Sequence, residues 1–81
     1  MENIRGNILW IDDEIEHLKP HILYLENKGY NIDSTNNGND GVILEKKNKY
    51  DIVLLDQNMP GKDGLETLKE LKTNNPFITI I

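Results

Sequence analysis

Cysteine is missing from this 81-residue sequence, which excludes a disulfide framework and a metal centre built on thiolates. Long apolar runs are missing too: none approaches the roughly 20 residues that a membrane-spanning helix needs, and residues 1–7 lack signal-peptide character. Basic residues are few, since 9 Lys and Arg face 14 Asp and Glu for a net charge of -5. That balance excludes a surface that holds nucleic acid by bulk electrostatics. We expect a protein of a reducing compartment, the cytoplasm.

Hydrophobic residues make up only 37% of the chain, which is little for an α/β core, and the length allows one domain at most. These residues are concentrated in short segments. Continuous apolar runs at residues 8–11 and 52–55 are typical of strands buried on both faces. Alternating apolar and polar residues at 30–35 indicate an edge strand, and the apolar run at 77–81 predicts a fourth strand.

Three segments between these strands have apolar residues at helical spacing, namely residues 15–28, 41–48 and 65–72. The first contains Pro20, which should bend the helix at about that position, and Gly29 should end it. Asn39 or Asp40 is expected to cap the second helix. Strands and helices that alternate in this order predict a parallel sheet built of right-handed βαβ units.

Carboxylates follow two of the predicted strands. Asp12 and Asp13 come directly after residues 8–11, and Asp56 comes directly after residues 52–55. In a flavodoxin-like, doubly wound sheet of order 2-1-3-4-5, these two strands are neighbours at the topological switch point. Three close acids repel one another, and Mg²⁺, which takes carboxylate, water and phosphate oxygens, removes that repulsion. The sequence therefore predicts a Mg²⁺ site with room for a phosphoryl group; the alternative is a set of acidic loop ends that never converge.

A second pair of candidate metal ligands is less informative. His17 and His21 stand four residues apart, a spacing that occurs in metal sites. Because no third ligand is evident, we interpret them as solvent-exposed histidines.

The two acidic segments resemble the receiver domain of bacterial two-component response regulators. The resemblance covers the whole chain and rests on Ile8-Leu9-Trp10-Ile11-Asp12-Asp13-Glu14 and Leu54-Leu55-Asp56-Gln57-Asn58-Met59-Pro60-Gly61-Lys62-Asp63-Gly64. It implies that Asp56 is the phosphoacceptor and that Asp13 and Asp56 bind Mg²⁺ directly. It also implies that Asp12 binds the metal mostly through water and that Asn58 offers its backbone carbonyl. The implied partner is a sensor histidine kinase or a phosphotransfer protein, and the implied function is a conformational switch rather than an enzyme.

The same resemblance implies further parts of the domain. The family has a Ser or Thr at the end of strand four and a Lys at the end of strand five, and Thr79, within the predicted fourth strand, is not that switch residue. Residues 1–81 are therefore interpreted as an incomplete receiver domain that lacks helix four, strand five and helix five. An open fourth strand would also favour dimerisation through that edge.

A closer likeness is carried by Leu18-Lys19-Pro20-His21-Ile22, Leu25-Glu26 and Gly29-Tyr30. These residues are similar to the PorX-type receivers linked to type IX secretion. In that group the receiver precedes a domain of the alkaline-phosphatase superfamily, which is the output domain that the likeness implies. It would also account for Pro20 as a trait of the subfamily.

Two other functions stay open on the sequence alone. A phosphatase of the haloacid-dehalogenase type also uses an Asp at the end of a strand as nucleophile, but it needs an acid two residues later, where this chain has Asn58. A receiver-like interaction module that works without phosphorylation would share the fold, although the acids at Asp12, Asp13 and Asp56 argue against it. Formation of an acyl phosphate discriminates between these possibilities.

Overall fold

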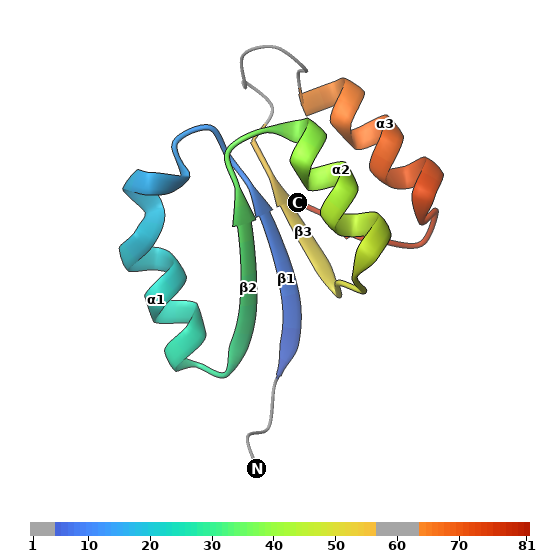
Figure 1. The fold of residues 1–81 in the computed structure, drawn as a ribbon. Helices are drawn as coiled ribbons and strands as arrows, with labels where there is room; N and C mark the ends of the chain where they lie inside the picture. Colours follow the sequence, from blue (N-terminus) through green and yellow to red (C-terminus); the bar gives the residue numbers. More distant parts are fainter. Residues whose placement is uncertain (1–4, 57–63) are drawn as a thin grey trace.

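The computed structural model describes residues 5–56 and 64–81. They form a four-stranded parallel sheet in the order β2-β1-β3-β4. Helix α1 lies on one side of this sheet, and α2 and α3 lie on the other (Figure 1). The elements in chain order are β1 (Gly6–Ile11), the 3-10 helix η1 (Ile15–Leu18), α1 (Lys19–Asn27), β2 (Tyr30–Thr35), α2 (Gly38–Lys47), β3 (Ile52–Leu55), α3 (Gly64–Asn74) and β4 (Thr79–Ile80). The predicted flavodoxin-like order is confirmed, with β1 and β3 side by side.

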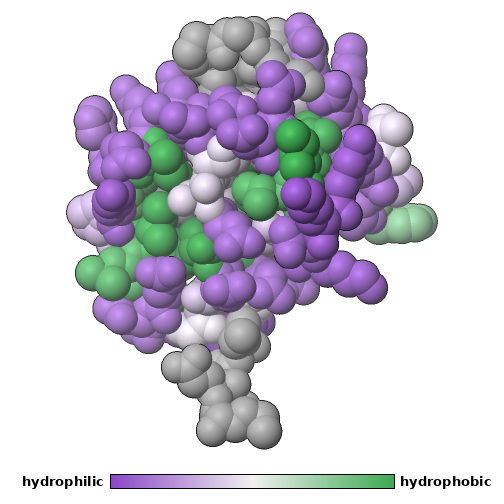
Figure 2. All heavy atoms as spheres, in the orientation of Figure 1, coloured by the Kyte–Doolittle hydropathy of each residue, from purple (hydrophilic) through white to green (hydrophobic). Residues whose placement is uncertain are grey.

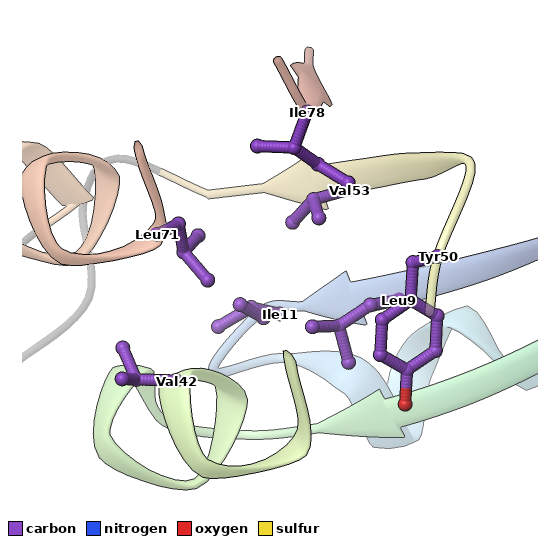
Figure 3. Packing of buried hydrophobic residues seen from close by; sticks show 7 residues of the cluster. All are labelled: Leu9, Ile11, Val42, Tyr50, Val53, Leu71 and Ile78. Atoms are coloured by element: carbon purple, nitrogen blue, oxygen red, sulfur yellow. The ribbon is translucent and has the colours of Figure 1, made fainter. Parts of the chain in front are cut away.

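The hydrophobic core lies between the sheet and the pair of helices α2 and α3. Leu9 and Ile11 of β1 and Val53 of β3 are fully buried there, because alternate residues of a strand point to the same face. They pack with side chains from the helices and from the ends of the loops, as Figure 3 shows: Val42, Tyr50, Leu71 and Ile78. This layer fixes the two central strands against the helices.

Within residues 5–56 and 64–81, α1 is the helix that covers the opposite face of the sheet (Figure 1). Trp10 of β1 lies there in an apolar groove of about 410 Å³, which α1 completes with Pro20, His21, Tyr24 and Leu25. The ring of Tyr24 remains largely open to solvent, at 61% exposure. Figure 2 shows hydrophobic residues where α1 meets the sheet and hydrophilic residues over most of the rest of that view.

The helix predicted over residues 15–28 is divided in two. A 3-10 turn is followed by α1, and Pro20 lies in the first turn of α1, where its missing N–H breaks no helical hydrogen bond. The interruption predicted near His17 to Pro20 is found there, but as a boundary between a 3-10 turn and a separate helix rather than as a bend in one continuous helix. Gly29 ends the helix with a φ of 99°, a conformation that other residues rarely adopt, and this confirms the predicted glycine stop.

Helix α2 begins at Gly38 rather than at residue 41. Its cap is Asn37, whose Oδ1 accepts a hydrogen bond from the Asp40 N–H at 2.8 Å, so the prediction of Asn39 or Asp40 as the cap is wrong. Glycine is a poor helix former, and Asn-Gly pairs are typical of turns. These local preferences favour a turn at residues 37–38, and for this reason the start of the helix was predicted too late in the sequence.

Strand β4 is shorter than the apolar run that predicted it. It contains Thr79 and Ile80, while Phe77 is 94% exposed and Ile78 is buried. A turn holds the preceding residues, because the Ile78 N–H donates to the Asn75 carbonyl at 3.1 Å and Lys72 Nζ donates to the Ile78 carbonyl. Among residues 5–56 and 64–81, every helix is too short or too polar to cross a bilayer.

Candidate functional site

Asp12, Asp13 and Asp56 lie together at the carboxyl edge of the sheet. Each offers one carboxylate oxygen, and these oxygens lie within 4.8 Å of one another. Asp12 and Asp56 are half-buried and Asp13 is exposed. The structure thus brings together the three acids that the sequence placed at the ends of two neighbouring strands, and they do not diverge as separate loop ends.

The sheet itself positions two of these acids. Strands β1 and β3 pair in parallel, with Ile11 opposite Leu55, and the Asp56 N–H donates to the Ile11 carbonyl at 2.9 Å. On the other side of β1, the Asp12 N–H donates to the Thr35 carbonyl at 3.1 Å. Asp12 and Asp56 therefore continue the strand ladders by one residue each, and their backbones are held by the sheet rather than by a free loop.

The chain turns sharply after β1, and Asp12 supports that turn. One oxygen of its carboxylate, Oδ1, accepts from the Glu14 N–H at 2.9 Å, and its carbonyl accepts from the Ile15 N–H at 3.0 Å. Asp side chains commonly bond the backbone two residues on in this way. The turn leads into η1 and places Asp13 at the sheet edge beside Asp56.

Helix α2 closes over the end of β1 because Gly41 has no side chain. A Cβ atom at Gly41 would lie 2.3 Å from Ile11 Cδ1 and 2.7 Å from Ile11 Cγ1. The close approach of α2 to β1 therefore requires glycine, and it presses on the residue whose carbonyl binds the Asp56 N–H.

Burial and the neighbouring acids disfavour the charged form of Asp13. Desolvation, a side-chain hydrogen bond with Asp56 and the negative charges of Asp56, Glu14 and Asp12 raise the pKa of the Asp13 carboxyl. Three carboxylate oxygens at this separation form a donor set that fits a hard divalent cation such as Mg²⁺. Such a cation would remove the repulsion that the raised pKa reflects.

The remaining candidate ligands are Asn58 and the two histidines. Asn58 lies outside the described residues, as do Pro60 and Gly61. His17 and His21 are exposed and belong to η1 and α1 respectively. Within residues 5–56 and 64–81, the acids form the one group with the geometry of a metal site.

Sequence reasoning missed the backbone partners of the acids, the carbonyls of Ile11 and Thr35. Nothing in a residue type marks a carbonyl as part of a site. The pairing register of the strands would have identified both carbonyls. Ile11 ends β1 next to Asp56 on the neighbouring strand end, and Thr35 ends β2 next to Asp12.

Comparison with known proteins agrees with this geometry. The family profile described as "Response regulator receiver domain" matches residues 8–81. The chain is 39% identical over 81 residues to the transcriptional regulatory protein ZraR of Klebsiella oxytoca, a match that covers 100% of this chain and 18% of ZraR. It is 37% identical over 65 residues to the transcriptional regulatory protein ResD of Bacillus subtilis, covering 80% of this chain and 27% of ResD.

Solved structures give the same assignment. The chemotaxis protein CheY4 of Vibrio cholerae superposes with a TM-score of 0.84 at 25% identity, over 93% of this chain and 64% of that one. A complex of the histidine kinase ThkA with the response regulator protein TrrA gives a TM-score of 0.82 at 32% identity, over 99% of this chain and 66% of the matched chain. The profile match, the sequence relatives and the shared fold together show that the chain belongs to the response regulator receiver domain family.

Proposed function

We propose that Asp56 of this receiver domain accepts a phosphoryl group in two-component signalling. The observation that carries the proposal is the convergence of Asp12, Asp13 and Asp56 at the ends of β1 and β3, with carboxylate oxygens within 4.8 Å of one another. Membership of the receiver family supplies the class of reaction. In this proposal the domain is a regulator that takes part in its own phosphorylation, rather than an enzyme that turns over a substrate.

Asp56 is the nucleophile of the proposed reaction. An oxygen of its carboxylate attacks the phosphorus atom of a kinase phosphohistidine, in line with the P–N bond. That bond breaks, its electron pair stays on the imidazole of the kinase, and an acyl phosphate forms on Asp56. The hydrogen bond from the Asp56 N–H to the Ile11 carbonyl supports this role, because a nucleophile fixed at a strand end loses little freedom on reaction.

Asp12, Asp13 and Asp56 would together hold the metal ion that the family uses. We propose Mg²⁺, since a hard cation takes carboxylate oxygens and shares phosphoryl oxygens, and when bound it would supply charge neutralisation at the phosphoryl group. Asp13 would give up any proton that its raised pKa retains. Asn58 is proposed as a further ligand through its backbone carbonyl, on the family resemblance alone.

The proposal is tested by incubating the protein with acetyl phosphate and MgCl₂ and measuring its intact mass. We expect a mass increase of one phosphoryl group that hydroxylamine reverses, because acyl phosphates react with it. The increase should be absent in Asp56→Asn and in wild-type protein treated with EDTA. Asp40→Asn, which changes an exposed Asp of α2, is the matched control and should be modified as wild type. An unmodified wild-type protein would instead favour an interaction module that works without phosphorylation.

A sensor histidine kinase or a phosphotransfer protein is the proposed phosphoryl donor. One similar structure is itself described as a histidine kinase in complex with a response regulator, which supports a kinase partner. The curated relatives are transcriptional regulators of which the chain spans 18% and 27%, whereas the PorX-type likeness predicts an alkaline-phosphatase-superfamily output domain. The PorX assignment, the cytoplasmic location and a dimer through the β4 edge stay predictions.

A further inference from the structure

Helix α2 buries a carboxylate far from the acid cluster. Its core-facing residues are Gly38, Gly41, Val42 and Glu45, so Glu45 occupies a position where the helix pattern calls for an apolar side chain. Glu45 is only 7% exposed, and its Oε1 is buried without a hydrogen-bond partner in the described part of the chain. A buried polar atom without a partner costs free energy, and a buried charge costs more.

Glu45 borders a cavity at the opposite edge of the sheet from Asp56. The cavity measures about 310 Å³, far more than the roughly 30 Å³ that one water molecule occupies in the liquid, and it lies where the carboxyl ends of α2 and α3 approach each other. Its other lining residues come from the last turns of these helices and from the segments that follow them: Lys46, Asn48, Lys49, Tyr50, Asn74 and Asn75. The volume is within the range of small-ligand sites.

The lining carries both signs of charge, and this restricts the ligand. A simple anion would meet the lysine ammonium groups of Lys46 and Lys49 but also the Glu45 carboxylate, whose buried Oε1 has no hydrogen-bond partner in the described part of the chain. A simple cation would satisfy Glu45 but would be repelled by the two lysines, which are exposed and free to reach over the opening on their flexible stems. Only a molecule with both charges complements all three residues.

We propose that this cavity binds a compact zwitterion, with a guanidinium or ammonium group on Glu45 and a carboxylate on Lys46 and Lys49. The class is that of amino acids and their close derivatives. A guanidinium suits Glu45 best, because it presents several N–H donors, is weakly hydrated and stacks on aromatic rings such as that of Tyr50. The carboxyl ends of the two helices add partial negative charge on the same side.

The test uses two ligands that differ by one charge, Nα-acetylarginine and Nα-acetylargininamide. Both carry the guanidinium, but only the first carries a carboxylate. They are titrated into ¹⁵N-labelled protein at constant ionic strength, and the backbone amide shifts of Glu45, Asn74 and Asn75 are followed. We expect saturable shifts confined to the cavity with Nα-acetylarginine, and binding of the amide that is weaker by about fivefold or more, which is typical of losing one charge-assisted hydrogen bond.

Glu45→Gln keeps the shape of the side chain and removes its charge, and it should weaken binding of Nα-acetylarginine by about tenfold. Glu26→Gln, on the exposed surface of α1, is the matched control and should bind as wild type. Lys49→Ala changes an exposed residue, so it tests the carboxylate contact without touching the core, and it should abolish the preference for the acid over the amide.

Three outcomes of the titrations would overturn the proposal. They are an absence of saturable shifts in wild type, equal affinity for the two ligands, and undiminished binding to Glu45→Gln. Thermal melting of the protein without added ligand is a separate readout. Glu45→Leu should raise the melting temperature, because it replaces a carboxylate with a buried, unpartnered oxygen by an apolar side chain. A lower melting temperature would mean that Glu45 is already paired within the protein, for instance with Lys49, and would also overturn the proposal.

Discussion

Adding one methyl group at Gly41 tests how α2 positions the acid cluster. In Gly41→Ala the new Cβ would lie 2.3 Å from Ile11 Cδ1 and 2.7 Å from Ile11 Cγ1, closer than carbon atoms can approach. Ile11 is fully buried, so its side chain has no open space to move into. Overpacking of this kind costs about 1–3 kcal/mol, whereas exchanging glycine for alanine inside a helix gains about 1 kcal/mol. Because the 2.3 Å contact is severe, we expect a steric cost at the upper end of that range and a net fall in the free energy of unfolding of about 2 kcal/mol.

Urea denaturation followed by far-UV circular dichroism measures this change. Asn39→Ala, on the exposed side of the same helix, controls for helix propensity and should lie within about 0.5 kcal/mol of wild type. Ile11→Val removes the Cδ1 atom and should couple favourably with Gly41→Ala, by about 1 kcal/mol in a double-mutant cycle. Additive effects of the two changes, or a Gly41→Ala protein as stable as wild type, would refute the steric argument.

The same substitution should affect function. Ile11 accepts the Asp56 N–H at 2.9 Å, so a displaced Ile11 also displaces the proposed nucleophile. We expect Gly41→Ala to slow acyl-phosphate formation from acetyl phosphate under conditions where the protein remains folded. An unchanged rate in a destabilised variant would show that the strand end tolerates the shift.

Three further substitutions test other parts of the structure. Asp13→Asn removes one of three close carboxylates, so the melting temperature without divalent cations should rise and the additional rise on adding millimolar MgCl₂ should shrink. Asp40→Asn, outside the cluster, should leave the rise on adding MgCl₂ unchanged. Tyr50→Phe removes the hydroxyl that donates to Asp33 Oδ2 at 2.6 Å, and urea denaturation should show a loss of about 1–3 kcal/mol, against none for the exposed Tyr24→Phe. Gly29→Ala forces a φ of 99° on alanine and should lower the free energy of unfolding by about 1–2 kcal/mol in the same assay. An equal loss in Lys28→Ala would show that the effect does not come from the backbone conformation of residue 29.

The arrangement of the strands could be predicted because it depends on patterns that survive in the sequence. Two continuous apolar runs and one alternating run identified β1, β3 and β2, and the order of the sheet was predicted by taking the alternating strands and helices as a flavodoxin-like, doubly wound fold. The acids could be located for the same reason, since Asp12 and Asp56 directly follow those runs and parallel strands share one carboxyl edge.

The capping residue of α2, and with it the choice of which α2 side chains face the core, could not be predicted from the local conformational preferences of the residues. Asn37 begins α2 because its side chain reaches the Asp40 N–H, although the glycines that follow it are typical of turns. That start sets the rotation of the helix and turns Glu45 inward. In the sequence Glu45 precedes two lysines and has the character of an exposed charge. Phe77, at 94% exposure, was misassigned to a strand because apolar character alone does not distinguish a strand from the turn before it.

Trp10 is the only tryptophan in the sequence, and its position gives it a practical use. It lies on β1, two residues before Asp12, which follows the strand, and on the α1 side of the sheet in a groove that is open to solvent. Indole emission depends on the polarity around the ring. The protein therefore contains its own fluorescent probe, separated from Asp12 by Ile11 alone, through which the proposed cation uptake and phosphorylation can be timed by stopped flow without attaching a dye.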